Sequence, residues 1–291
     1  MKIWRFCTVL WFIGIFFVQA PSASALVITV RTDWVASPFH RATPGYVWQN
    51  DPDILKTYNT TSVTNLCLTS AIGTALLHQF AYETPSSGQL KLAGYSAVDG
   101  QSPTIDTAKL LADLTTRCKG DVALGTTIDN SVRCSAEFYQ NSGYSNAKVK
   151  VIRRYDHSMT GRGVEHENRL ATPMDIEAAL AQGYQVIASL AIIHWDENLK
   201  KWQKVSSHSM NVVGLSPDKN FGAFRLFVVN PTRAYQIDGV NPVFDEARIA
   251  TQTEVVTPFP ERYSPWVISG PLLTRPNTLT VLAGLLLLRT H

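Results

Sequence analysis

The 291-residue sequence is short of cysteine and short of charge. Four cysteines are too few to staple a chain of this length into a disulfide scaffold. Charged residues make up only 17% of the chain, and no basic stripe is interleaved with aromatic residues, so we do not expect a nucleic-acid partner. The hydrophobic content of 45% excludes disordered, collagen-like and coiled-coil chains.

The motifs of several common enzyme classes are also absent. The sequence has no G-x-S-x-G, no P-loop and no G-x-G-x-x-G, which leaves serine-hydrolase, NTPase and dinucleotide-binding functions without a motif. It also lacks H-E-x-x-H and C-x-x-C. We interpret the acidic and histidine residues between 156 and 167 as a mobile polar loop over a cleft rather than as a metal site. We therefore expect no metal and no other cofactor.

The N-terminus has the pattern of a secretory signal peptide. Lys2 and Arg5 precede an apolar run at 9–18, and the sequence ASA follows at 23–25. The run is about half of the roughly 20 residues that a membrane-spanning helix needs, so we expect cleavage near Ala25. The mature protein is then secreted, periplasmic or held at the cell surface. Without the two N-terminal cations it carries 24 basic and 23 acidic side chains.

A second short apolar run, at 279–288, lies near the C-terminus and is followed by Arg289. Three interpretations remain open: a sorting tail like those of Gram-negative exported proteins, a GPI-type signal, or a buried terminal helix. A tail of either of the first two kinds would allow transient membrane association. Five of the 15 prolines lie just before it, which predicts an irregular cover because proline removes ladder donors. The chain is thus divided into a signal peptide at 1–25, one domain at 26–257, a proline-rich cover at 258–276 and a hydrophobic tail at 277–291.

Hydrophobic periodicity predicts helices first and strands afterwards. The predicted helices cover 65–80, 106–118 and 129–141, with a short one that begins after Thr172 and ends before Gly183. The predicted strands cover 148–151, 185–193, 208–215 and 224–229. This order indicates an α+β chain whose halves form two lobes.

The cysteines divide into a pair and a single thiol. Cys7 leaves with the signal peptide, so three cysteines remain in an oxidising compartment. Cys118 and Cys134 lie 16 residues apart on two neighbouring predicted helices, where a disulfide is feasible. Cys67 is then the free thiol, in the first turn of a helix whose N-terminus lowers a thiol pKa. The alternative is a buried cysteine that packs as a small hydrophobic residue.

A nucleophilic thiol needs a base, and the base needs a group to orient it. His208 begins the apolar strand SHSMNVVG at 207–214, which would hold its ring rigidly at the mouth of a cleft. Asn230 ends the next predicted strand, 22 residues later. If the two strands pair, the Asn230 amide lies within reach of the imidazole.

These segments resemble the papain-like cysteine peptidases, most closely the bacteriocin-precursor-processing branch and its secreted relatives. The sequence NLCLTSA at 65–71 is similar to the start of that family's nucleophile helix, and the His208 strand and Asn230-Pro231 are similar to its catalytic-histidine strand and its orienter. The resemblance spans roughly 49–231. It implies a papain-like two-lobed fold, with a helical lobe followed by an antiparallel β lobe. It also implies a monomeric thiol hydrolase that cleaves peptide or protein substrates with Cys67, His208 and Asn230.

The sequence departs from the family pattern at two positions. The family places a glutamine about six residues before the cysteine to complete the oxyanion hole, and this chain has Thr61 there. Gln49, Asn59 and Asn65 are candidate substitutes. Leu68 replaces the glycine that commonly follows the cysteine. Two alternatives therefore stay open: a catalytically inactive binding module and a thiol acyltransferase on the same fold.

Overall fold

The computed structural model describes residues 46–61, 64–82, 95–96, 104–142, 144, 146–155, 159, 161, 163–218, 222–233, 244–251, 261, 263–270 and 277–290. The predicted signal peptide at 1–25 lies outside the described residues, and so does most of the predicted cover at 258–276.

The helices predicted from periodicity are confirmed. The structure contains α1 (Pro52–Thr57), α2 (Cys67–Tyr82), α3 (Thr107–Arg117), α4 (Ile128–Asn141) and α5 (Pro173–Ala181). Polar side chains cap four of them by accepting backbone N–H bonds: Asp51 at α1, Asp106 at α3, Thr127 at α4, and Thr172 with Asp175 in a capping box at α5. Only the short α1 was not predicted.

The strands form one small and one large sheet within the described residues. A two-stranded sheet pairs β1 (Tyr95–Ser96) with β2 (Thr104–Ile105). The large sheet contains β3 (Lys148–Ile152), β4 (Val164–Glu167), β5 (Gln185–Asp196), β6 (Lys201–Pro217), β7 (Ala223–Val229), β8 (Asp245–Thr251), β9 (Trp266–Ser269) and β10 (Thr278–Arg289). Its order is β4-β3-β10-β5-β6-β7-β8-β9, and β9 also pairs with β10, so six strands form a closed ring of pairings. The predicted α+β class is confirmed.

Three sequence-based expectations are wrong in detail. The sheet is antiparallel except that β4 pairs parallel with β3, so it is mixed. The segment 164–167, predicted as part of a mobile loop, is strand β4, because β3 offers it a parallel ladder; Lys148 and Lys150 on β3 also form ion pairs with its glutamates. Strand β9 lies inside the segment predicted as an irregular cover.

The apolar run near the C-terminus is neither a tail outside the domain nor a helix. Residues 278–289 form β10, which lies between β3 and β5 in the middle of the sheet. Its side chains are buried along almost the whole strand. A strand that is covered on both faces has a continuous apolar sequence, so hydrophobicity alone did not distinguish it from a buried helix or an export tail. No helix in the described ranges is both long enough and apolar enough to cross a membrane.

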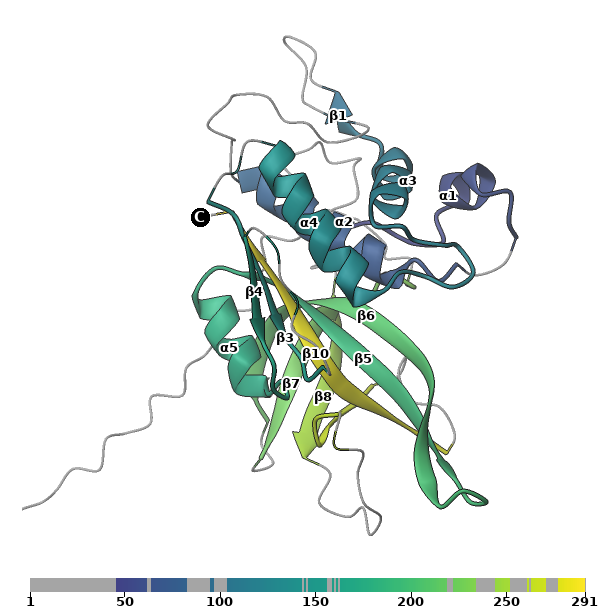
Figure 1. The fold of residues 1–291 in the computed structure, drawn as a ribbon, viewed down its shortest axis with the longest axis vertical. Coiled ribbons are helices and arrows are strands. Elements are labelled where there is room, and N and C mark those ends of the chain that lie inside the picture. The colour runs from purple at the N-terminus through teal and green to yellow at the C-terminus, as the bar shows by residue number, and fades with distance from the viewer. Residues whose placement is uncertain are drawn as a thin grey trace, which may run out of the picture.

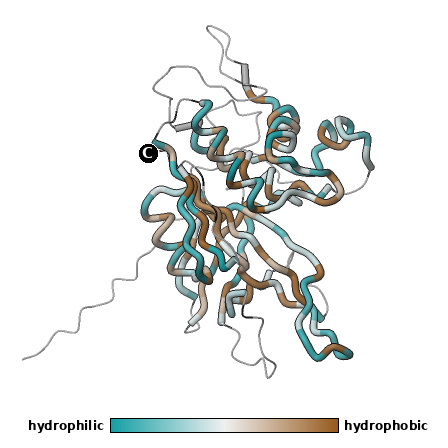
Figure 2. The backbone as a smooth tube through the Cα atoms, in the orientation of Figure 1, coloured by the Kyte–Doolittle hydropathy of each residue, from teal (hydrophilic) through white to brown (hydrophobic). Residues whose placement is uncertain are grey.

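Two helical layers flank the large sheet. Helices α1 to α4 gather over one end of the sheet, whereas α5 packs on its other side (Figure 1). Helix α2 is central: its described side chains from Leu68 to Gln79 are all buried, and they include polar ones such as Thr74 and Gln79. Hydrophobic residues are concentrated where the strands pass beneath these helices (Figure 2). The end of β6 that faces α2 is therefore the place where the two parts of the chain meet.

Candidate functional site

Cys67 is the first residue of α2 and lies in the wall of a cavity of about 930 Å³. The thiol is free and half-buried. The cavity is lined on one side by the start of α2 and the segment 119–129, and on the other side by β5, β6 and β10. The cavity thus separates the helical part of the chain from the sheet, and the one free cysteine of the described residues faces it.

The donors around the Cys67 sulfur come from β6 and from the start of α2. Burial raises the pKa of the Cys67 thiol, because removal from water penalises the thiolate. Hydrogen bonds from the backbone and side chain of Ser209, and from the N–H groups of Leu68 and Cys67, act in the opposite direction. The balance is a raised pKa, so the resting thiol is protonated and needs a base to ionise.

His208 and Asn230 form the pair that their sequence spacing predicts. His208 Nε2 donates to Asn230 Oδ1 at 2.9 Å. The same oxygen accepts from the Thr232 N–H at 3.1 Å and the Thr232 hydroxyl at 2.8 Å. A backbone N–H can only donate, so this contact fixes which amide atom is the oxygen and therefore which ring nitrogen carries the hydrogen. The imidazole is held with its proton on Nε2 and its lone pair on Nδ1.

Two neighbouring residues of β6 are involved in the site: Ser209 contacts the Cys67 sulfur, and His208 pairs with Asn230. The ladder between β6 and β7 ends where Asn211 pairs with Val229, and the chain leaves the sheet at Asn230. Along a strand, backbone N–H groups two residues apart point to the same side. The Ser209 N–H therefore points to the side that β7 has left, and there it donates to Cys67. The His208 side chain leaves β6 on the face opposite Ser209, so its ring approaches this edge from the other face.

The three candidates for the oxyanion hole lie in different places. Gln49 is buried beside the site: its backbone N–H donates to the Pro231 carbonyl at 3.0 Å, and its side-chain amide donates to the Thr64 carbonyl. Asn65 lines the cavity, and its amide donates to the Ala123 carbonyl. Asn59 is exposed in the turn after α1, with a φ of 48°. The structure thus brings Gln49 and Asn65 to the site and leaves Asn59 away from it.

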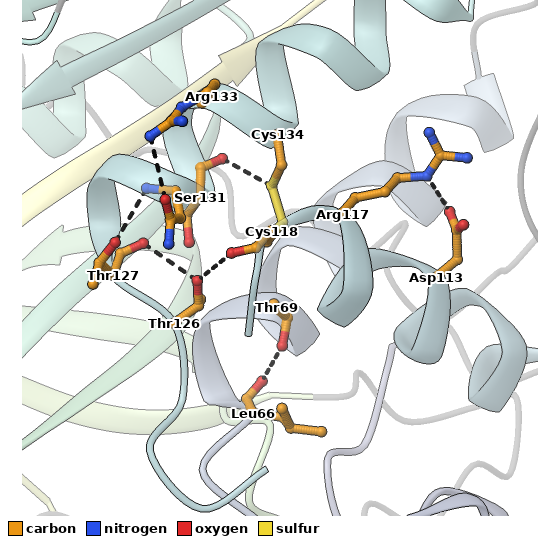
Figure 3. Close-up of a disulfide and its surroundings, with 11 residues drawn as sticks. Leu66, Thr69, Asp113, Arg117, Cys118, Thr126, Thr127, Ser131, Arg133 and Cys134 are labelled. Carbon is orange, nitrogen blue, oxygen red and sulfur yellow. Dashed lines mark hydrogen bonds and ion pairs between the residues drawn. A yellow bond between two sulfur atoms is a disulfide. The ribbon is translucent and has the colours of Figure 1, made fainter. Parts of the chain in front are cut away.

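The predicted disulfide is confirmed and supports one wall of the cavity. Cys118 at the end of α3 is bonded to Cys134 inside α4, with their Cα atoms 5.0 Å apart (Figure 3). The Thr126 hydroxyl donates to the Cys118 carbonyl at 2.7 Å within the same loop. In the same loop, the Val122 carbonyl accepts a hydrogen bond from the Asn65 N–H at 2.8 Å. The disulfide-closed loop is therefore anchored two residues before Cys67.

Two cavity residues, Ser209 and Arg153, were not identified from the sequence. Ser209 follows the predicted histidine directly, but its contact with the sulfur depends on which side of β6 faces α2. Arg153 follows β3, a strand far from the cysteine in the sequence, and enters the cavity across β10. No local pattern in the sequence announces either position, because both depend on strand pairing.

The described residues also bear on whether the protein could bind a metal ion. Among the described residues no group of three or more histidine, cysteine, aspartate or glutamate side chains is placed to hold a metal ion. No protein-family model matches the chain, and no curated protein matches it. A functional argument therefore depends on the site itself: a thiol at a helix start in the wall of a cavity, and an oriented imidazole on the adjacent strand β6.

Proposed function

We propose that this protein is a secreted, papain-like thiol hydrolase that cleaves peptide or related amide bonds. Cys67 is the nucleophile, His208 the base and Asn230 the residue that orients the base. The observation that carries the proposal is the succession of His208 and Ser209 on β6, where Ser209 contacts the Cys67 thiol beside a large cavity and Asn230 orients the His208 imidazole. The order of the chain, with α1 to α4 before the large sheet, supports a papain-like fold.

The reaction proceeds by proton exchange at His208 Nδ1, since Nε2 is engaged by Asn230. Nδ1 takes the thiol proton as the sulfur attacks the substrate carbonyl, and the resulting imidazolium gives that proton to the leaving amine. Water, deprotonated by the same nitrogen, then attacks the thioester and releases the acid and the free thiol. The N–H of Cys67 at the start of α2 supplies one donor for the developing oxyanion.

Secretion is part of the proposal. The signal-peptide pattern at the N-terminus supports it, and the Cys118–Cys134 disulfide is typical of an oxidising compartment.

An inactive papain-like binding module is the second candidate, and one observation favours it. The side-chain amides of Gln49 and Asn65 both donate to backbone carbonyls of the protein, at Thr64 and Ala123. Neither amide is aimed at a substrate oxygen in this state, and the family glutamine is replaced by Thr61.

Alkylation by iodoacetamide between pH 6 and 8 tests the proposal. We expect the reagent to alkylate the Cys67 thiol of the wild type and to leave Cys67→Ala unlabelled. The alkylation of His208→Ala should be at least about tenfold slower than that of the wild type. His194→Ala is the matched control, because His194 lies at the far end of β5 and contacts the Asn277 carbonyl instead. Labelling of His208→Ala at the wild-type rate would show that the imidazole does not activate the thiol. Hydrolysis of a peptide mixture, followed by mass spectrometry, then separates an active hydrolase from a binding module.

A further inference from the structure

The backbone of Arg153 is held firmly at the end of β3. Its N–H donates to the Glu167 carbonyl at 3.1 Å, and its own carbonyl accepts from His166 Nε2 at 3.0 Å. These two hydrogen bonds fix the position of the Arg153 backbone. The direction of its side chain then depends on the residues of the neighbouring strand β10.

The stem of Arg153 passes over Gly284 on β10. A Cβ atom at Gly284 would lie 2.9 Å from the Arg153 Cβ and 3.1 Å from its Cδ. These distances are shorter than any normal carbon–carbon contact, so only glycine leaves room for the arginine here. A bulge between Leu282 and Gly284 interrupts the pairing of β10 with β5 at the same point. The strand is thus shaped to let this side chain cross it.

The guanidinium of Arg153 ends in the Cys67 cavity without a carboxylate partner among the described residues. Its Nη1 lies 3.5 Å from the Ser189 hydroxyl, and its Cζ lies 4.7 Å from the centre of the Tyr155 ring. Burial raises the pKa of Tyr155 to about 12, so the phenol is neutral and does not compensate the charge. Other arginines of the described chain form close ion pairs, such as Arg169 with Asp175 at 2.6 Å.

A row of small residues connects this guanidinium with the thiol. Gly284 on β10 pairs with Ser189 on β5, and Ser189 pairs with Ser209 on β6. Arg153 lies over the first two residues of the row, and Cys67 contacts the third. Neighbouring strands are about 5 Å apart, so the backbone of Ser189, beside the guanidinium, lies about that far from the backbone of Ser209, beside the thiol. That separation fits a charged group on the residue next to the bond that Cys67 would attack.

Asp121, one of the two carboxylates of the opposite wall, is committed to its own backbone. Asp121 Oδ1 accepts from the N–H groups of Ala123 and Leu124, both at 2.8 Å. Asp129 lies in the first turn of α4, where the helix N-terminus favours its negative charge. An incoming anion is therefore the natural partner for the guanidinium.

We propose that Arg153 binds a carboxylate of the substrate in the Cys67 cavity, so that the protein selects peptides with an acidic group beside the attacked bond. The planar guanidinium suits bidentate contact with a carboxylate. The carboxylate belongs either to an acidic side chain or to a free C-terminus. This inference rests on the proposed function, because a bound peptide is a substrate only if the protein is a hydrolase. Binding of the carboxylate itself does not require catalysis.

Binding to Cys67→Ala, which cannot turn over, tests the site without catalysis. Three acetylated tripeptides serve as probes in calorimetry: Ala-Glu-Ala amide, Ala-Gln-Ala amide, and Ala-Gln-Ala with a free C-terminus. We expect one carboxylate peptide to bind at least about tenfold more tightly than the neutral amide, and its identity distinguishes the two sources of the carboxylate. We expect the double variant with Cys67→Ala and Arg153→Gln to bind the carboxylate peptide no more tightly than the neutral amide. Adding Lys204→Gln, which removes another cation from the same cavity, leaves the preference within about twofold.

The ratio of alkylation by iodoacetate to that by iodoacetamide gives a second measurement in the active protein. Both reagents lose iodide to the Cys67 thiolate, and only the first carries a carboxylate. Arg153→Gln should lower the ratio about tenfold while Arg153→Lys retains part of it, because lysine keeps the charge and loses the fork. A carboxylate preference that survives Arg153→Gln, or no preference in any peptide, overturns the inference. A preference without any peptide hydrolysis keeps the site and rejects the proposed function instead.

Discussion

At the scale of single residues, the site depends on two side chains that hold two others. Ser209 holds the Cys67 sulfur with its N–H and its hydroxyl, and Asn230 holds the His208 ring through Nε2. Because burial raises the thiol pKa, the sulfur does not ionise by itself at neutral pH. The chemistry therefore requires the imidazole to be correctly oriented before the substrate arrives.

Removal of the orienting amide tests this requirement. We expect Asn230→Ala to slow iodoacetamide alkylation of Cys67 at pH 7 about tenfold, because the His208 ring loses the bond that fixes its tautomer. Thr232→Val removes one of the donors to the same oxygen and should slow the reaction less than about threefold. Equal rates for Asn230→Ala and the wild type would show that the amide contributes to packing only.

The sequence revealed the residues of this site better than their surroundings. Cys67 begins a helix and Asn230 follows a strand, whereas His208 stands inside β6, directly before its buried apolar part. Ser209 and Arg153 escaped prediction because the contact of each depends on strand register, and a strand pattern does not state which strands are neighbours.

At the scale of elements, capping explains why the helix ends were predictable. Helix α5 begins with Thr172 and Pro173, and the capping box is completed by Asp175, which also pairs with Arg169. Short polar signals of this kind need no tertiary context. The strands β4, β8 and β9 have no such signal: they are short, and they are strands because a neighbour offers a ladder.

The α5 capping box should make stability depend on acid pH. Burial raises the pKa of Asp175, but hydrogen bonds from Arg169 and Thr172 outweigh it, so the pKa lies below its usual value. A lowered folded-state pKa stabilises the fold above the unfolded pKa of about 4, and this stabilisation is lost as the pH falls through the folded-state value.

Urea unfolding at pH 7 and pH 3 measures this contribution. Asp175→Asn should lower the free energy of unfolding by about 1 kcal/mol at pH 7 and by much less at pH 3. Asp113→Asn is the control, since Asp113 forms an exposed pair with Arg117 on α3 and should cost less than about 0.5 kcal/mol. An equal loss for Asp175→Asn at both pH values would contradict the linkage.

At the scale of the whole molecule, β10 joins the parts of the sheet. It pairs with β3 on one side and β5 on the other, and it contacts β9 as well. It also places Ala283 in the lining of the cavity and Gly284 beside the stem of Arg153. The apolar run that the sequence left open between an export tail and a helix is therefore central to both the fold and the site.

Truncation after Pro276 should abolish the folded state. Loss of β10 exposes the apolar faces and ladder edges of β3 and β5, which costs far more than the roughly 5–15 kcal/mol by which domains are stable. We expect loss of cooperative unfolding by circular dichroism, together with aggregation. Removal of Thr290 and His291 alone should leave the unfolding transition in place, because both lie after β10. A truncated protein that unfolds cooperatively would show that β10 is dispensable.

The position of β10 also has a consequence for the order of synthesis. Every other described strand and helix leaves the ribosome before it, so the large sheet stays split into two unpaired parts until the last residues emerge. The part of the cavity lining that β10 contributes is missing for the same period. A nascent chain that has not yet been extended through β10 consequently carries Cys67, His208 and Asn230 without the complete cavity of the folded protein.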